Sequence, residues 1–371
     1  MSIIFSFILI KLSLPLEIAC LILTFCDEKT VLTAGQVSHH WYCLCKDNYV
    51  WKQLYSSKYT LPTGRPFDYR CLFEKRAHLA QRWKAGKMQA TLLTGHTDSI
   101  YCLQFDKNKM ITGSRDRTIK IWDMHTLYPL HTLRGHHASV LCLQYDDDML
   151  VSGSSDHTIM VWSLSTFTME LCLRGHHSGV LDVCFDKSRI ASCSKDATIR
   201  LWQRGTGQHL QTLVGHRGPV NAIQFSGDRL VSASGDTMIK LWDLATGNCL
   251  RDFTGHEHGL ACIRFDGKRI VSGSNDNKIK VWNAESGECI MTCQGHTGLV
   301  RSLHFDKDKI VSGSYDQSIR VWDINTGECI RTYEHCHSSW VFDVMFDDTK
   351  IISTSQDHKI LIMDFGHDIH L

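Results

Sequence analysis

The residues most suggestive of chemistry in this 371-residue chain are seven sets of one histidine, one serine or threonine and one aspartate. In each set the hydroxyl residue lies sixteen positions after the histidine, and the aspartate follows four positions later. The sets are His96, Thr112 and Asp116; His136, Ser152 and Asp156; His176, Ser192 and Asp196; His216, Ser232 and Asp236; His256, Ser272 and Asp276; His296, Ser312 and Asp316; and His337, Ser353 and Asp357. A hydrolase needs one such constellation at one substrate site, and seven copies do not fit that need. We therefore predict a repeated scaffold and a protein that is not an enzyme.

Each set lies inside a unit that recurs every forty residues. The first unit begins at Gly95-His96 and ends at Trp122-Asp123. The next five begin at Gly135, Gly175, Gly215, Gly255 and Gly295, with tryptophans at Trp162, Trp202, Trp242, Trp282 and Trp322. A seventh begins one residue late, at Cys336-His337, and ends at Met363-Asp364. This period, with Gly-His near the start and Trp-Asp near the end, is typical of β-propeller blades.

Alternating apolar residues within the first unit predict strands over residues 100–105, 110–114 and 118–122, and a fourth over 130–133. Four short antiparallel strands make one blade, so seven units predict a seven-bladed ring over residues 87–371. The seventh unit lacks a convincing fourth strand of its own after Asp364, whereas residues 88–93 read as a strand. We expect this early strand to complete the last blade and close the ring.

The repeated histidine, hydroxyl, aspartate and tryptophan resemble the hydrogen-bonded tetrad of WD repeats. Buried histidine and aspartate need such partners to offset their desolvation. Because Met363 replaces the tryptophan, we expect the seventh blade to be the least stable.

The composition is that of an ordinary globular protein, with 43% hydrophobic residues and a formal net charge of +1. This near balance gives no global attraction to nucleic acid or to anionic membranes, and neither is predicted as a partner. Sixteen cysteines include no CxxC pair, and several lie forty residues apart at equivalent positions of different units. We expect reduced thiols, no metal or other cofactor, and a location in the cytoplasm, the nucleus or both.

The first sixty residues carry helical patterns. The apolar run over residues 3–10 is interrupted by Lys11, and later by Pro15 and Glu17, so we expect neither a membrane span nor a secretion signal. From there Ile18, Leu21, Ile22 and Phe25 follow the spacing of one helical stripe. Two interpretations stay open: a cap that packs only on its own chain, or a docking module.

The markers Leu14-Pro15-Leu16-Glu17-Ile18, Val37 to Trp41, and Trp51 to Leu54 resemble the F-box, which we assign to residues 1–60. The resemblance implies docking on the Skp adaptor and, through it, on a cullin. Leu14, Pro15, Ile18, Leu21 and Ile22 would then be divided between adaptor contact and the domain's own core. Residues 61–86 predict a linker with a helix that stops at Gly86, either a rigid spacer or a plain solvated connector.

Function is expected where the seven units differ. Three positions of each unit should face one mouth of the ring. The first set is Ser99, Ser139, Gly179, Pro219, Gly259, Leu299 and Trp340; the second is Tyr101, Leu141, Leu181, Asn221, Ala261, Arg301 and Phe342; the third is Arg115, Ser155, Lys195, Gly235, Asn275, Tyr315 and Gln356. These positions hold three cations and no acid. Guanidinium binds phosphate bidentately, so the mouth suits a phosphorylated peptide, whereas three dispersed cations make a poor track for RNA.

An F-box, a helical linker and seven WD repeats resemble the substrate receptors of SCF ubiquitin ligases. Residues 232–236, 259–283 and 299–323 look closest to the beta-TrCP branch. The resemblance implies a receptor that binds a phosphorylated degron and promotes ubiquitin-dependent proteolysis. It matches Tyr101, Arg115, Ser139, Ser155, Leu181, Lys195, Asn221, Ala261, Leu299, Arg301, Tyr315 and Phe342 to lining positions of that branch. Trp340 stands where the branch has a further arginine, which favours a more apolar or a singly phosphorylated motif. The alternative is a propeller scaffold in a complex unrelated to ubiquitin.

Overall fold

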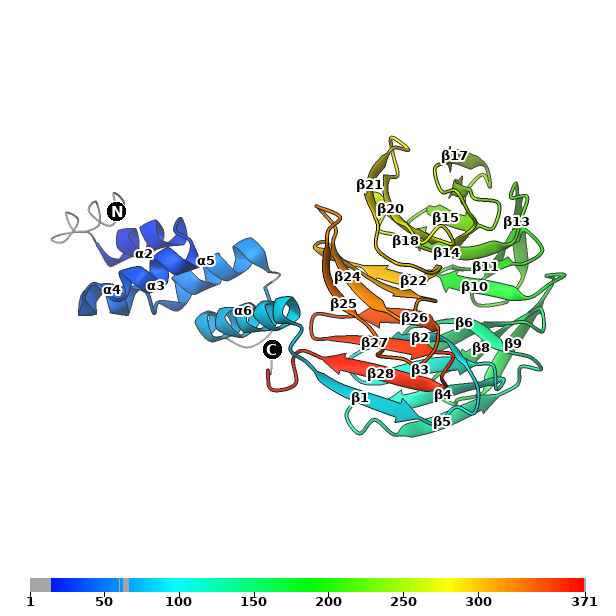
Figure 1. Ribbon diagram of the computed structural model, residues 1–371, viewed down its shortest axis with the longest axis horizontal. Coiled ribbons are helices and arrows are strands. Elements are labelled where there is room, and N and C mark those ends of the chain that lie inside the picture. The colour runs from blue at the N-terminus through cyan, green and yellow to red at the C-terminus, as the bar shows by residue number, and fades with distance from the viewer. Residues whose placement is uncertain (1–14, 60, 63–66, 370–371) are drawn as a thin grey trace. The chain divides into compact units, whose positions relative to one another are not determined.

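A computed structural model describes residues 15–59, 61–62 and 67–369 (Figure 1). The chain forms two compact units. One unit contains the helices up to Lys87 together with the residues from Phe365 onward, and the other spans Met88–Asp364. Each unit has its own hydrophobic core.

The described helices of the first unit are short and mostly begin at a capping side chain. They are α2 (Leu16–Thr24), α3 (Glu28–Ala34), α4 (His39–Leu44), α5 (Asn48–Lys58) and α6 (Tyr69–Ala85). Asp27, Ser38, Asp47 and Asp68 each precede a helix and accept a hydrogen bond from a backbone N–H of its first turn. These caps satisfy donors that a helix start leaves unpaired, and thereby fix where each helix begins. None of the described helices has the length and apolar character needed to cross a membrane.

Trp51 of α5 lies at the centre of the helical core. Its Nε1 donates a hydrogen bond of 2.6 Å to the Cys45 carbonyl, and Phe73 of α6 meets its ring edge-on at 5.4 Å. The helix that we predicted within the linker thus packs on α5 and belongs to one compact unit with the preceding helices. Gly86 ends α6 with φ of 68°, a left-handed conformation that glycine adopts without strain, as the sequence predicted.

The second unit consists of seven four-stranded antiparallel sheets, which confirms the predicted seven-bladed propeller (Figure 1). Blades one to three contain β2 (Ile100–Phe105), β3 (Lys109–Ser114), β4 (Thr118–Asp123) and β5 (Pro129–Arg134); β6 (Val140–Tyr145), β7 (Met149–Ser154), β8 (Thr158–Ser163) and β9 (Met169–Arg174); and β10 (Val180–Phe185), β11 (Arg189–Ser194), β12 (Thr198–Gln203) and β13 (His209–Val214). Blades four and five contain β14 (Val220–Ser226), β15 (Arg229–Ser234), β16 (Ile239–Asp243) and β17 (Cys249–Phe253); and β18 (Leu260–Phe265), β19 (Arg269–Ser274), β20 (Ile279–Asn283) and β21 (Cys289–Cys293). Blade six contains β22 (Val300–Phe305), β23 (Lys309–Ser314), β24 (Ile319–Asp323) and β25 (Cys329–Tyr333).

The seventh blade is built from both ends of the propeller sequence. It contains β26 (Val341–Phe346), β27 (Lys350–Ser355), β28 (Lys359–Asp364) and, as its outer strand, β1 (Gln89–Thr94). β1 runs antiparallel to β28, with Gln89 opposite Asp364 and Thr94 opposite Lys359. The predicted closure by an early strand is confirmed, one residue later than the sequence placed it.

The repeated polar residues form a buried network in every blade. In blade one, His96 Nδ1 lies 2.7 Å from Asp116 Oδ2, and His96 Nε2 lies 2.9 Å from Thr112 Oγ1. Thr112 Oγ1 also accepts a hydrogen bond of 2.9 Å from Trp122 Nε1. Blades two to six repeat this arrangement. All seven hydroxyl residues are inaccessible to solvent, so a substrate cannot reach them and the sets are structural.

The seventh blade departs from the pattern at two coupled positions. In blade one, a Cβ added to Gly95 would lie 2.8 Å from the ring of Trp122, closer than a Cβ can pack, and the glycines of the next five blades meet their tryptophans at 2.8 to 3.1 Å. The tryptophan therefore requires a glycine. In blade seven Met363 replaces the tryptophan, and Cys336 occupies the glycine position. His337 keeps its contacts to Asp357 and Ser353, so this network lacks only the indole donor.

This coupling predicts a non-additive double substitution. M363W alone should destabilise the propeller by about 1–3 kcal/mol, because the indole would overlap Cys336. C336G with M363W should recover that loss and add the missing hydrogen bond to Ser353. Urea unfolding of the two single variants and the double variant measures the interaction free energy. Additive effects would show that the two departures are independent.

Candidate functional site

The innermost strand of every blade carries one extra residue near its start. The pairing register of these strands with their neighbours skips a single position in all seven blades. The skipped residues are Tyr101, Leu141, Leu181, Asn221, Ala261, Arg301 and Phe342. Bulges of this kind re-aim a side chain, and they are over-represented next to functional sites. All seven side chains line one cavity of ≈ 80 Å³ in the central channel, and they are the second predicted set.

The first and third predicted sets are tied together by backbone pairing. In each blade the residue before the Asp turn donates its N–H to the carbonyl of the residue before the inner strand. The pairs are Arg115–Ser99, Ser155–Ser139, Lys195–Gly179, Gly235–Pro219, Asn275–Gly259, Tyr315–Leu299 and Gln356–Trp340, all at 2.8 to 3.0 Å. These bonds place two loops of each blade side by side at the mouth of the channel. The three predicted positions per blade therefore belong to one end of the ring.

Aromatic rings from blades one, six and seven form a continuous group. Tyr315 and Trp340 stack face to face, with centroids 4.5 Å apart and planes 6° from parallel. Phe342 meets both rings edge-on, at 5.9 Å from Tyr315 and 6.5 Å from Trp340. Tyr101 lies 4.8 Å from Phe342 on its other side. Stacked and edge-on pairs each stabilise by about 0.5–1.5 kcal/mol beyond burial, so these rings hold one another in place.

Two of the predicted cations, Arg115 and Arg301, act electrostatically on the Tyr101 phenol. Burial raises the pKa of this phenol, and the positive charges of Arg115 and Arg301 oppose that rise. Arg301 Nη1 lies 3.4 Å from the Ala261 carbonyl, at the edge of the cavity. Arg115 is mostly exposed, and its Nε lies 3.7 Å from Asp98. The Asp98 carboxylate lies beside the mouth, although it is not one of the twenty-one positions that the sequence predicted to face it. Those positions contain no acid, but the mouth therefore has an acidic neighbour.

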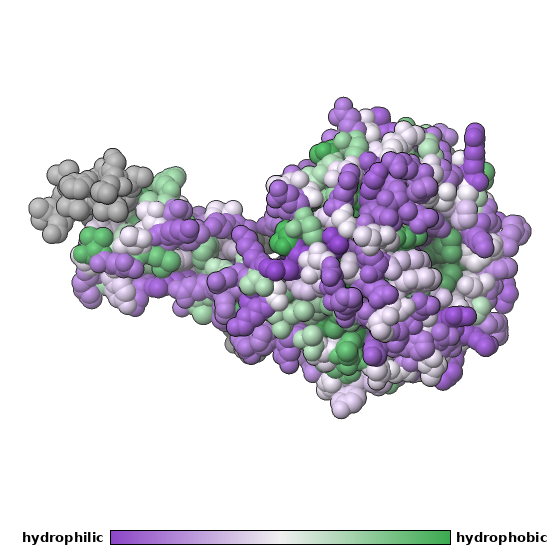
Figure 2. Space-filling model, viewed as in Figure 1, coloured by the Kyte–Doolittle hydropathy of each residue, from purple (hydrophilic) through white to green (hydrophobic). Residues whose placement is uncertain are grey.

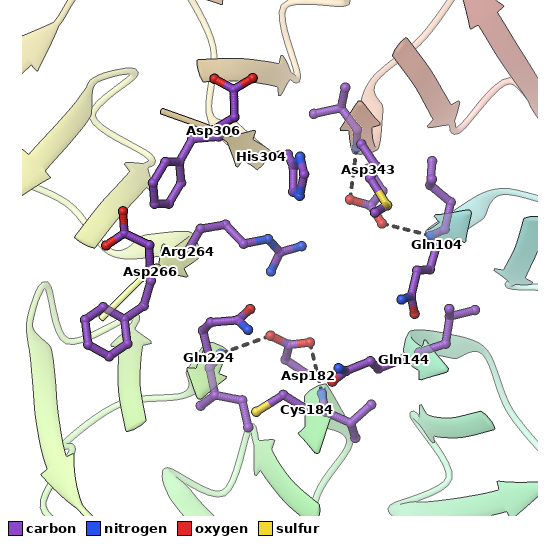
Figure 3. A pocket seen from close by; sticks show the side chains of 18 of the residues that line it. Gln104, Gln144, Asp182, Cys184, Gln224, Arg264, Asp266, His304, Asp306 and Asp343 are labelled. Atoms are coloured by element: carbon purple, nitrogen blue, oxygen red, sulfur yellow. Dashed lines mark hydrogen bonds between the residues drawn. The ribbon is translucent and has the colours of Figure 1, made fainter. Parts of the chain in front are cut away.

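Two partly buried carboxylates that line the cavity join neighbouring blades next to the bulges (Figure 3). Asp182 accepts hydrogen bonds from the N–H groups of Val183 (2.9 Å) and of Ile223 in the next blade (3.0 Å). Burial raises its pKa to about 6, although the positive charge of Arg264 opposes the shift. Folding therefore favours the protonated form of Asp182. The free energy of unfolding that this protonation contributes is lost as the pH rises through about 6.

Asp343 occupies the equivalent place in blade seven. It accepts from Leu103 N–H (2.8 Å), Val344 N–H (2.9 Å) and the Ser302 hydroxyl (2.6 Å), so it links blades six, seven and one. Both aspartates directly follow a bulged residue, at a position that the other blades fill with cysteine, alanine or serine. That break in the repeat was a usable signal, and the sequence reasoning missed it.

Below this level the channel widens into a polar cavity of ≈ 510 Å³. Arg264 extends into it near Asp182 and Asp343, as Figure 3 shows. His304 also lines the cavity, and its Nδ1 is buried without a hydrogen-bond partner. Among the described residues no cluster of histidine, cysteine, aspartate and glutamate could hold a metal ion.

The helical unit presents a second candidate surface. On α2 the side chains of Ala19, Cys20 and Leu23 are buried in the core, whereas Ile18 and Leu21 are exposed. The predicted adaptor residues thus divide as follows: Pro15, Ile18 and Leu21 face solvent, Ile22 is partly buried, and Leu14 lies outside the described residues. Leu16, Phe25, Leu32 and Val37 are also exposed, and Figure 2 shows apolar residues at the surface of this unit. The sequence of α2 alone could not show which of its apolar side chains are buried and which are exposed.

The structure brings most of the predicted ligand residues together. Tyr101, Leu181, Asn221, Ala261, Arg301 and Phe342 line the upper cavity, and Leu141 joins them although it was not singled out. Tyr315 and Trp340 adjoin these cavity residues through their ring contacts with each other and with Phe342. Arg115 acts electrostatically on Tyr101. Ser139, Ser155, Lys195 and Leu299 do not line this cavity and are positioned at the mouth by the backbone pairs.

Two protein families match this chain. A model described as F-box-like matches residues 11–57. A model described as WD domain, G-beta repeat matches seven segments, at residues 86–123, 127–163, 167–203, 207–243, 247–283, 287–323 and 327–364. Each match spans the outer strand of one blade and the three inner strands of the next, and the seven together cover more than half of the chain.

Several curated proteins are similar over part of their length. The probable E3 ubiquitin ligase complex SCF subunit sconB of Arthroderma benhamiae is 30% identical over 159 residues, which are 33% of this chain and 24% of that protein. F-box/WD repeat-containing protein 7 of Drosophila melanogaster is 33% identical over 126 residues, 29% of this chain and 10% of that protein. The crystal structure of the computationally designed Ika8 protein matches with a TM-score of 0.63 and 35% identity, over 73% of this chain and 85% of that one. The chain therefore matches a quarter or less of the length of these curated relatives.

The partly buried His304 predicts a pH dependence of stability. Burial first, and the charge of Arg264 second, lower its pKa from 6.5 to about 4. Between these two values the unfolded chain binds a proton that the native state does not, so His304 destabilises the fold as the pH falls from 6.5 towards 4. In H304Q the urea midpoint should fall less between pH 7 and pH 5 than in the wild type. H177Q, which removes an exposed histidine, is the matched control. Equal slopes in H304Q and wild type would contradict this assignment.

Proposed function

This chain belongs to the F-box and WD-repeat proteins, and we propose that it is the substrate-recognition subunit of an SCF-type ubiquitin ligase. Its own part is binding rather than catalysis. The F-box unit would dock on a Skp adaptor and through it on a cullin, while the propeller mouth holds the substrate for ubiquitin-dependent proteolysis. The sixteen free thiols fit a reducing compartment, the cytoplasm or the nucleus.

The ring of seven bulged residues is the observation that carries the proposal. Scaffold residues repeat in every blade, whereas these side chains differ from blade to blade and all line one cavity. Arg301 and Tyr101 line that cavity, and the backbone pair Arg115–Ser99 places Arg115 at its mouth, so two guanidinium groups and a phenol serve one binding surface. A phosphorylated side chain supplies acceptor oxygens and negative charge for such donors, and charge-assisted hydrogen bonds are the strong ones. The ligand is therefore a phosphorylated segment of a protein substrate.

The exposed apolar side chains of the helical unit support adaptor docking. Leu16, Ile18, Leu21 and Phe25 are solvent-exposed although the same helix already fills its core with Ala19, Cys20 and Leu23. Exposed apolar groups on a small unit mark a surface that a partner covers. An adaptor with a complementary apolar surface would bury them.

Reversing the charge of Arg301 tests the ligand site. R301E should reduce the affinity for a phosphopeptide at least about tenfold, because a charge-assisted hydrogen bond contributes about 1.5–3 kcal/mol. A phosphopeptide array, with unphosphorylated peptides alongside, first identifies a ligand, and fluorescence polarisation then measures affinity. R134E changes an exposed arginine of β5 and should bind like the wild type. Equal affinity of R301E and R134E would remove Arg301 from the site.

Charging the F-box surface tests adaptor docking. L21D should abolish co-purification with a Skp adaptor, because it places a carboxylate on a surface that must become buried. L210D, at a leucine of similar exposure on β13, is the matched control. Thermal unfolding should show both variants folded. If the wild-type chain fails to retain the adaptor, the rival interpretation holds, namely a propeller scaffold in a complex unrelated to ubiquitin.

A further inference from the structure

One side of the mouth is walled by exposed aromatic surface. Trp340 is 42% exposed although it is among the largest apolar side chains of the protein. One face of its indole is covered by Tyr315, and the edge of Phe342 fixes the pair from below. An aromatic side chain that is rigid and still exposed is the kind of residue that dominates binding interfaces. Phe342 contacts both Trp340 and Tyr101, so Trp340 belongs to the same surface as the cavity residues.

Half of the variable positions of blades four and five hold small residues. These are Gly235, Gly259 and Ala261, and the other three are Pro219, Asn221 and Asn275. A Cβ added to Gly259 would lie 2.9 Å from the Cα of Gly235, so the two loops touch and leave no room for side chains. The rim at blades four and five therefore carries less side-chain bulk than the aromatic rim of blades one, six and seven.

The charge of the mouth matches one phosphate better than two. Arg115, Lys195 and Arg301 at the mouth and Arg264 beneath it are opposed by Asp98, Asp182 and Asp343, so four cations and three carboxylates leave a formal net charge of +1. A phosphorylated side chain carries about −1.5 to −2 at neutral pH, whereas two carry about −3 to −4. Lys195 of blade three is the one cation of the predicted positions besides Arg115 and Arg301, and its blade is two blades from that of Arg115 and three from that of Arg301. A second phosphate would therefore lack a comparable set of donors.

Resting on the function proposed above, we propose that the mouth selects singly phosphorylated peptides that carry an aromatic or large aliphatic residue at a fixed distance from the phosphate. The phosphate lies between Arg301, Arg115 and the Tyr101 hydroxyl. The apolar side chain lies on the free face of Trp340, where it buries surface that is otherwise exposed to water. Trp340 is thus a specificity-determining residue, and Arg301 is required for binding of any ligand.

A positional peptide library tests this assignment on the full chain. One library contains a single fixed phosphoserine with randomised flanking positions, and a second contains an additional phosphoserine at each offset in turn. The wild type should enrich phenylalanine, tyrosine, tryptophan, leucine or methionine at one offset, and should gain little from the second phosphate. W340A should lose this preference, with an affinity lower by about ten- to a hundredfold, and should still require the phosphate.

Two further variants separate the possible outcomes. W340R should bind doubly phosphorylated peptides better than the wild type, because it adds a cation to the mouth. Y128A removes an exposed aromatic residue outside the mouth and should change nothing. Phosphate-dependent binding with no apolar preference, or with equal preference in W340A, overturns this inference and leaves the receptor function intact. If no phosphopeptide binds, the proposed function fails together with the inference.

Discussion

The buried hydrogen bonds around Asp116 and its six counterparts hold the functional end of the molecule in place. Burial alone would raise the pKa of Asp116, but hydrogen bonds from His96 and Thr118 outweigh it and keep the carboxylate ionised. The same carboxylate accepts from the N–H of Thr97, and Ser114 donates to the Asp98 carbonyl. The loop after Gly-His and the turn before the third strand are thereby locked together. Both loops carry the variable residues, so the scaffold network determines where the ligand residues lie.

Much of the fold followed from periodicity, because a unit repeated seven times gives seven independent observations of one pattern. The same alignment placed Tyr101, Arg301 and Phe342 at equivalent positions before their geometry was known. The bulge that turns these side chains into the channel left no sequence signal, since it is a property of backbone pairing between two strands. The repeat therefore predicted which residues share a place, while the structure shows why that place is the mouth.

Charges that occur only once were harder to predict. Asp182, Arg264 and Asp343 lie one level below the mouth and depend on contacts between different blades, which the pattern within one blade does not describe. Asp98 precedes a predicted position by one residue, and its approach to Arg115 depends on side-chain conformation. In the helical unit, both faces of α2 are apolar. Burial of Leu23 and exposure of Leu21 follow from how α2 packs against α5, which sequence spacing could not show.

The pairing of β1 with β28 has a consequence for how the protein folds during its synthesis. During synthesis β1 leaves the ribosome first and must wait for the whole propeller sequence before its partner exists. Contacts between such distant segments form late, since the chain must first close a very long loop. Trp340 and Phe342 belong to the blade that this last pairing completes. A nascent or truncated chain therefore has no finished mouth, and the capacity to capture a substrate arises only in molecules that have been translated to the end of β28.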